Sequence, residues 1–192
     1  ALILLVLAGC DKESEPKGQA QPASTAKAGA SDKADITLES ANGMRATLSY
    51  QFAGQKAPSA PFADAQGQDV SLADFEGKPL LLNIWATWCA PCKAEMPTLD
   101  ALAKLEKGRM SVIAVSQDLE GRAPVAAFFT ETGVKNLVPY TDADNALLTA
   151  FNNAIALPTT ILYDSDGKEV WRVAGGVEWD EAEMAKLLRA AD

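Results

Sequence analysis

Short apolar runs and a helical repeat organise the second half of the chain. Residues 79–85 (PLLLNIW) and 111–115 (SVIAV) are apolar over the length of a strand, which is typical of strands buried on both faces. Between them, apolar residues recur at helical spacing over 96–105, so a helix is expected to follow Cys89. A strand, a helix and a second strand in this order predict a βαβ unit with a parallel strand pair.

After this unit, the pattern of apolar and turn residues predicts three short elements, a hairpin and a last helix. The short elements are a helix at 124–132, a strand at 137–140 and a helix at 145–152. Strands at 159–163 and 169–173 flank the turn sequence DSDG, so we expect them to pair as an antiparallel hairpin. Asp180 and Glu183 form a capping-box pattern, which predicts that the last helix begins there.

The first part of the chain is less regular and divides by composition. Apolar and polar residues alternate weakly over 36–52, around an Asn-Gly pair that favours a tight turn, so a short β-hairpin is expected. We divide the chain into four parts: a signal-peptide remnant at 1–9, a tether at 10–35, an N-terminal extension at 36–57 and a main domain at 58–192.

The N-terminal segment has the features of a lipoprotein signal peptide followed by the cysteine that carries the lipid. Its first nine residues are uncharged and Leu-rich, and they are far fewer than the ~20 that a membrane-spanning helix needs. The sequence LAGC ending at Cys10 resembles a bacterial lipobox, in which the cysteine receives a lipid. An ordinary signal end or a buried helix with an incidental cysteine is the alternative. The polar tether that follows is expected to be flexible, and Asp11 favours the inner membrane over the outer.

Charge and composition exclude several classes of function. The 192 residues contain 26 acidic and 17 basic side chains, a formal charge of −9 that repels phosphate backbones, so no nucleic-acid partner is expected. Histidine is absent from the sequence, which removes the commonest zinc ligand and the usual partner of a protease nucleophile. The chemistry must therefore come from other side chains.

Two of the three cysteines form the motif WCAPC where a buried strand is expected to turn into a helix. Unpaired N–H groups at a helix N-terminus favour a thiolate, and the two-residue gap lets Cys89 and Cys92 close a disulfide. Cys89 is expected to be the more exposed sulfur and the nucleophile, and Cys92 the resolving thiol, with Pro91 restricting the helix start. Half of a zinc site and a purely structural disulfide are the alternatives, but the second ligand pair that zinc needs is missing. We expect no metal and no cofactor.

From Pro61 to its end the chain resembles the TlpA/ResA/DsbE group of thioredoxin-like proteins. The residues that carry the resemblance are FEGKP leading into LLLNIWATWCAPCKAEMP, then ALPTT, and the hairpin sequence YDSDGKEVWRVAG. The resemblance implies an α/β thioredoxin-like fold, with a mixed central sheet flanked by helices. An αβ insertion at 121–141 and the N-terminal extension would be added to that fold.

The resemblance also assigns roles around the cysteine pair. It implies that Pro158 is a cis-proline facing the active site and that Leu157 offers its backbone to an extended partner segment. It places Glu95 near the thiols, where its charge would raise their pKa values; a solvated helix glutamate is an equal alternative. Trp88 is expected beside Cys89 as partner surface.

The function expected from this resemblance is reduction of disulfides in client proteins of the cell envelope. The clients could be apocytochrome c or copper-site proteins, and a membrane thiol carrier of the DsbD/CcdA type would re-reduce the pair. The protein would face the periplasm, anchored through the lipid on Cys10. A peroxiredoxin-like peroxidase and a non-enzymatic copper-binding assembly factor are the alternative functions.

Overall fold

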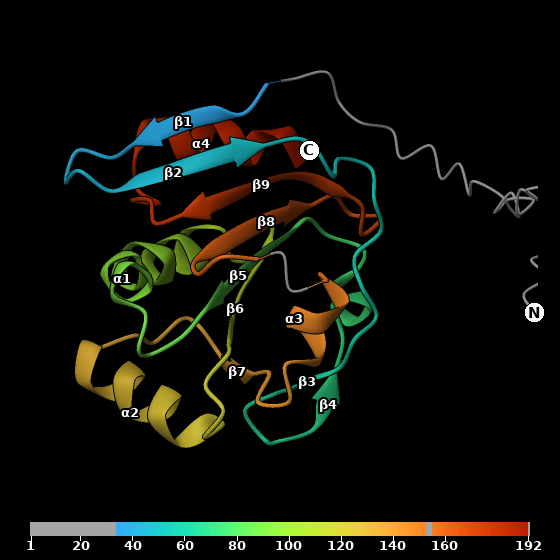
Figure 1. The fold of residues 1–192 in the computed structure, drawn as a ribbon, viewed down its shortest axis with the longest axis vertical. Helices are drawn as coiled ribbons and strands as arrows, with labels where there is room; N and C mark the ends of the chain where they lie inside the picture. Colours follow the sequence, from blue (N-terminus) through green and yellow to red (C-terminus); the bar gives the residue numbers. More distant parts are fainter. Residues whose placement is uncertain (1–33, 153–154, 192) are drawn as a thin grey trace, which may run out of the picture.

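A nine-stranded mixed sheet forms the centre of the molecule in a computed structural model that describes residues 34–152 and 155–191 (Figure 1). The order of its strands is β1-β2-β9-β8-β5-β6-β7-β3-β4. The strands are β1 (Ile36–Glu39), β2 (Arg45–Ser49), β3 (Phe62–Ala63), β4 (Asp69–Val70), β5 (Leu80–Trp85), β6 (Ser111–Ser116), β7 (Pro139–Thr141), β8 (Thr159–Tyr163) and β9 (Glu169–Gly175). The helices are η1 (Leu72–Phe75), α1 (Ala90–Leu105), α2 (Arg122–Thr132), α3 (Ala146–Ala150), α4 (Ala182–Leu188) and η2 (Arg189–Ala191).

The centre of the sheet is the predicted βαβ unit. β5 and β6 run parallel with α1 between them in the chain, while β8 lies antiparallel on the other side of β5. β5 is buried along its whole length, as expected for a strand covered on both faces. Its C-terminal end leads directly into the cysteine motif, so a fully buried central strand positions the start of α1.

Two apolar cores lie on the two faces of this sheet. One core contains the buried side chains of α1, α2 and α4, and the other contains those of η1 and α3. Along β5, Leu81 and Trp85 belong to the first core, while Leu80, Leu82 and Ile84 belong to the second. Asn83 shares the parity of Leu81 and Trp85, so it faces the side of the sheet that α1 covers.

Most of the expected elements are present, with shifted ends. The hairpin of β8 and β9 is confirmed, and α2 begins two residues before its predicted start. The strand expected at 137–140 is β7, displaced toward the C-terminus, and the helix expected at 145–152 is the shorter α3. The region 121–141, expected as an αβ insertion, holds α2 and β7, with β7 parallel to β6.

The N-terminal hairpin is part of the central sheet. β1 and β2 pair antiparallel around residues 41–43, and β2 pairs in turn with β9. Gly175 is required at this junction because its φ is +109° and a Cβ there would lie 2.4 Å from the Arg45 carbonyl oxygen. The hairpin therefore lengthens the same sheet that positions the cysteines (Figure 1).

The predicted capping box of the last helix is wrong. α4 begins at Ala182 with Glu181 as its N-cap, and no side chain caps the helix, so Asp180 lies outside it. The Glu181 carboxylate instead accepts a hydrogen bond from the Ala41 amide at 2.9 Å. The nearby loop of the N-terminal hairpin thus provides a donor that a local sequence pattern cannot reveal.

Candidate active site

The two cysteines of the motif form a disulfide at the N-terminus of α1. The Cys89 and Cys92 sulfurs are bonded at 2.02 Å, with the Cα atoms 5.3 Å apart. Cys89 is the N-cap residue, and its sulfur accepts a hydrogen bond of 3.4 Å from the Cys92 amide. A thiolate on Cys89 would be stabilised at this position by that amide and by the helix dipole.

The two sulfur-bearing residues differ in their access to solvent. Cys89 keeps 7 % of its surface exposed, whereas Cys92 is fully buried inside the core that α1 covers. Pro91 follows as one of the first two residues of α1 and has no N–H group that would lack a partner. Of the two residues, Cys89 is therefore the more accessible to an incoming molecule.

The proline loop preceding β8 is held against the start of α1. The Leu157–Pro158 peptide bond is cis, and the Pro158 carbonyl accepts a hydrogen bond of 2.8 Å from the Gly175 amide. Gly176, which follows Gly175 in the chain, packs on the start of α1. A Cβ atom on Gly176 would lie 3.5 Å from the Pro91 Cβ atom. Leu157 itself is half-buried and packs against the core that contains both cysteines.

An apolar hollow is bordered by Trp88, the residue that precedes Cys89. Its volume is about 450 Å³, and Trp88 and Leu157 lie on its wall together with Gln117, Leu119, Asn145, Leu148 and Ile155. Trp88 and Leu119 are each 67 % exposed, which is unusual for large apolar side chains. Trp88, which precedes Cys89, and Leu157, which precedes the cis-proline Pro158, thus border the same hollow.

Glu95 is buried beneath the cysteine pair. It is fully buried and lies one helical turn after Cys92. One carboxylate oxygen accepts a hydrogen bond of 2.7 Å from the Asn83 side chain, and the other accepts one of 3.1 Å from the Val177 amide. Burial raises the pKa of Glu95 to about 7, because desolvation outweighs the hydrogen bonds that stabilise the ionised form. Of the two interpretations of this residue, the structure supports the buried one.

Sequence reasoning missed two polar residues that support this site. Asn83 lies fully buried in β5 and connects Glu95 with Thr160 in β8, to which its side-chain amide donates at 2.9 Å. Asp118 accepts hydrogen bonds from the backbone and side chain of Thr87, two residues before Cys89. The signal for Asn83 was its place inside an apolar run, because a polar side chain there requires partners. Asp118 follows β6 without any motif.

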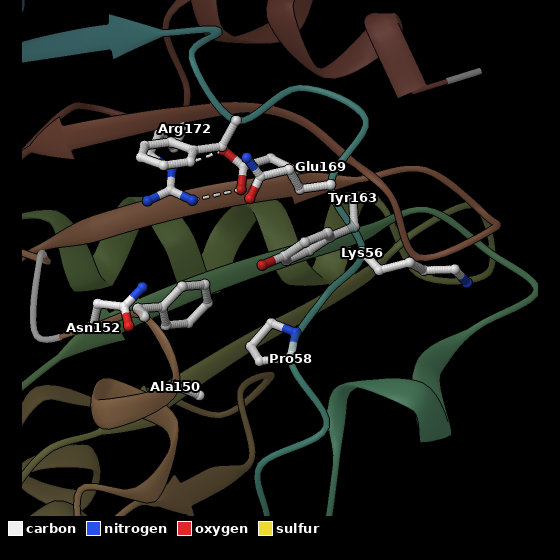
Figure 2. Close-up of a pocket in the computed structure, with 10 residues that line it drawn as sticks. Lys56, Pro58, Ala150, Asn152, Tyr163, Glu169 and Arg172 are labelled. Carbon is white, nitrogen blue, oxygen red and sulfur yellow. Dashed lines mark hydrogen bonds and ion pairs between the residues drawn. The ribbon is translucent and has the colours of Figure 1, made fainter. Parts of the chain in front are cut away.

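A second hollow lies at the other end of the sheet (Figure 2). It measures about 300 Å³ and contains the paired side chains of Glu169 and Arg172, with Arg172 stacked on the Phe52 ring at 3.8 Å. Tyr163 also lines this hollow and pairs with Leu80 at the start of β5, whereas Cys89 follows the end of that strand. The hollow is therefore separate from the disulfide.

Several expectations concern residues or groups beyond this site. Cys10 and most of the tether lie outside the described residues. Within residues 34–152 and 155–191, no helix is both long and apolar enough to cross a membrane. The same residues contain no group of three or more histidine, cysteine or acidic side chains that could hold a metal ion.

Comparisons with known proteins agree with this geometry. The Redoxin family matches residues 52–188. Thiol-disulfide oxidoreductase ResA of Bacillus thuringiensis subsp. konkukian is 34 % identical over 123 residues, which cover 64 % of this chain and 69 % of the relative. ResA of Bacillus subtilis is 36 % identical over 123 residues, covering 64 % and 67 %.

Solved structures give the same result for the fold. A protein described as thiol:disulfide interchange protein DsbE from Chlorobium tepidum superposes with a TM-score of 0.63 at 25 % identity, over 73 % of this chain and 98 % of that one. A thiol-disulfide oxidoreductase from Bacteroides vulgatus gives a TM-score of 0.62 at 28 % identity, over 74 % and 99 %. The thioredoxin-like fold is thereby confirmed.

The fold and the cysteine pair define a thioredoxin-like thiol-disulfide oxidoreductase. The chain belongs to the Redoxin family, and within it to the TlpA/ResA/DsbE-like enzymes.

Proposed function

We propose that this enzyme reduces disulfides of client proteins in the bacterial cell envelope, using Cys89 and Cys92 as its dithiol. The observation that carries the proposal is the difference in access between the two sulfurs. Cys89 lies at a helix N-terminus directly after Trp88, which borders the apolar hollow, while Cys92 is fully buried. This arrangement suits a nucleophile and a resolving thiol.

The reaction begins with the reduced pair and a client disulfide. The Cys89 thiolate attacks one client sulfur, so a bond forms between Cys89 and that sulfur while the other client sulfur leaves as a thiolate. Cys92 then loses its proton and attacks the Cys89 sulfur. The mixed disulfide breaks, the Cys89–Cys92 disulfide forms, and the client leaves with both electrons as a dithiol once its thiolates take up protons.

Glu95 is the group that we assign to the proton of Cys92. It is buried one helical turn from that cysteine, and its pKa of about 7 lets the carboxylate accept a proton near neutral pH. When ionised, its negative charge raises the pKa of the neighbouring thiols and slows their attack. When protonated, that penalty disappears, so transfer of the Cys92 proton to Glu95 would help the second step.

The apolar hollow is the surface that we assign to the client. An extended client segment would lie across Trp88 and form backbone hydrogen bonds with Leu157, next to Pro158 and Cys89. The half-buried position of Leu157 and the exposure of Trp88 support this assignment. Such a surface recognises an unfolded stretch by its backbone and apolar side chains, which suits clients without a fixed structure.

We infer the cellular setting from the lipobox-like sequence that ends at Cys10 and from Asp11 after it. Lipidation of Cys10 would hold the enzyme at the periplasmic side of the membrane, and Asp11 favours the inner membrane. A membrane dithiol carrier of the DsbD/CcdA type would supply two electrons per cycle by re-reducing the Cys89–Cys92 disulfide. Apocytochrome c, with its paired haem-attaching cysteines, and copper-site proteins are the clients that we infer.

The test is a trapping experiment with a defined client. The Cys92→Ala variant is mixed with an oxidised peptide that contains an intramolecular CxxCH disulfide. A covalent adduct on Cys89 that a dithiol releases is the expected product, and the Cys89→Ala variant is the matched control that should form far less of it. Equal adducts from both variants, or none from either, would refute the proposed roles of the two cysteines.

The same preparations separate the alternative functions. The wild-type enzyme should reduce the peptide disulfide faster than it consumes hydrogen peroxide. Copper titration of the reduced enzyme should give no tight stoichiometric complex. Rapid peroxide turnover without peptide reduction would favour a peroxidase, and tight copper binding without peptide reduction would favour a copper-assembly factor.

A further inference from the structure

Asn83 occupies the junction between three elements of the site. Its side-chain amide donates one hydrogen bond to Glu95 in α1 at 2.7 Å and another to Thr160 in β8 at 2.9 Å. All three side chains are at most 1 % exposed. The carbonyl oxygen of the Asn83 carboxamide is buried and has no hydrogen-bond partner among the described residues. This orphaned acceptor is unusual because a buried polar atom without a partner costs free energy.

The hydrogen bond from Asn83 to Glu95 is strongest when the acid is ionised. An ionised carboxylate is an acceptor alone, so it needs the N–H end of the amide. A protonated carboxyl group adds an O–H donor to its remaining acceptor, and when the proton lies on the oxygen that faces Asn83 this donor needs the oxygen end. Turning the carboxamide over would exchange its two ends and place the orphaned oxygen against Glu95.

Thr160 permits this exchange without losing a partner. A hydroxyl group can accept a hydrogen bond from the amide nitrogen or donate one to the amide oxygen. The contact between Asn83 and Thr160 can therefore persist in both orientations. Each orientation leaves one end of the carboxamide unpaired, so the protonation state of Glu95 decides which orientation is preferred.

We propose that Asn83 is a positioning residue for Glu95, and that its carboxamide turns over when Glu95 is protonated, with the Thr160 hydroxyl as its partner in both states. The inference rests on the proposed function in one respect, which is the proton exchange between Cys92 and Glu95. In that step the S–H bond of Cys92 breaks and an O–H bond forms on Glu95. The proton returns to the cysteine pair when the incoming dithiol re-reduces it.

The surroundings of Glu95 leave few other groups that could explain its titration. From the segment after β9 the Val177 amide and the Trp179 side chain face it, and from β5 Asn83 does. Its own helix contributes Cys89 and Cys92, which are the titratable groups in this set. In the oxidised enzyme these cysteines do not titrate, so Glu95 can be followed alone.

The experiment follows the titration of Glu95 and of Asn83 in the oxidised enzyme. Carbon-13 NMR of labelled glutamate reports the carboxyl group, with Glu95→Gln identifying its signal. Nitrogen-15 NMR of labelled asparagine reports the side-chain amide. We expect the Asn83 amide signals to change with the same midpoint as the Glu95 carboxyl. Asn136 is the internal control, because its amide donates to Asp100 and should not follow that midpoint.

Two variants test the causal role of the amide. Asn83→Leu keeps the approximate volume and removes the charge-assisted hydrogen bond to the ionised carboxylate, which is stronger than any bond to the protonated acid. The Glu95 midpoint should therefore rise by at least one pH unit. Thr160→Val removes only the hydroxyl and should shift the midpoint by a smaller amount; it serves as the test if Asn83→Leu does not fold. An unchanged midpoint in a folded Asn83→Leu enzyme, or Asn83 signals that ignore the Glu95 titration, would overturn the proposal.

A double-variant comparison separates this role from general damage to the sheet. The pH profile of alkylation of the reduced cysteines is measured for Glu95→Gln alone and together with Asn83→Leu. The two profiles should coincide if Asn83 acts through Glu95, and a further shift in the double variant would contradict that. Because the NMR midpoints need no client, they remain decisive even if the trapping experiment refutes the proposed function.

Discussion

Replacing Glu95 by Gln should remove a large pH-dependent part of the stability of the oxidised enzyme. Gln keeps the size of the side chain and cannot ionise. The oxygen of the Gln side chain can accept the hydrogen bond from Asn83, and any cost of placing an amide beside the Val177 N–H is independent of pH. The quantity to compare is therefore the difference in free energy of unfolding between wild type and Glu95→Gln at each pH.

The sign of the effect follows from the raised pKa of Glu95. The folded enzyme holds the proton of Glu95 with a pKa of about 7, against 4.5 for a free glutamate. Protonated Glu95 therefore favours the folded state, fully so below pH 4.5, and this contribution is lost as the pH rises through the folded-state pKa. The rise in pKa corresponds to a contribution of about 3 kcal/mol to the free energy of unfolding. Because Glu95 is fully buried, solvent does not screen this contribution.

The assay is urea unfolding of the oxidised enzyme, followed by tryptophan fluorescence at about five pH values from roughly pH 4.5 to 8.5. The stability of wild type relative to Glu95→Gln should fall by about 3 kcal/mol across this range. Glu131→Gln, at an exposed position of α2, is the matched control and should stay parallel to wild type. Parallel curves for wild type and Glu95→Gln would refute the reasoning, because they would mean that Glu95 has the same pKa in the folded and the unfolded enzyme.

Three further substitutions test the polar contacts that hold the site and the sheet. Asp118→Ala removes the acceptor of both Thr87 hydrogen bonds and should lower the free energy of unfolding by about 3 kcal/mol, measured in urea; a loss below about 1 kcal/mol would contradict it. Asp100→Ala leaves three backbone N–H groups at 135–137 without their acceptor and should lower the Tm by roughly 6–12 °C in calorimetry, whereas an unchanged Tm would mean that water replaces the carboxylate. Glu169→Gln breaks the buried pair with Arg172 and should cost about 3–5 kcal/mol with little dependence on salt, and a strong salt dependence would show that the pair is screened.

The local sequence was sufficient for the redox pair and the strands around it. The apolar runs at 79–85 and 111–115 predicted β5 and β6 because a strand buried on both faces needs apolar residues throughout. Resemblance to a known family, rather than the pattern itself, led to the cis state of Pro158. The ends of β7 and α3 were displaced, since their limits depend on contacts with other elements.

The supporting polar groups could not be assigned from sequence in the same way. Glu95 had two equal interpretations, because a helix repeat does not report which side chain another element will cover. In the sequence, Asn83 is only a single polar residue in an apolar strand. Its hydrogen-bond partners could not be predicted, because they come from α1 and β8. The capping box at Asp180 failed because Glu181 contacts a loop from the opposite end of the chain.

The sequence by itself determined where the chemistry resides: two cysteines one helical turn apart, at a point where an apolar strand becomes a helix. That spacing allows the disulfide, and the helix start favours a thiolate, whatever surrounds them. Only the tertiary structure decided how the pair is tuned. Asn83 of β5 and Val177 of the segment after β9 supply hydrogen bonds to the buried Glu95, and Thr160 of β8 holds Asn83 in turn. The pKa of Glu95 depends on this solvation and on neighbours that are distant in the chain.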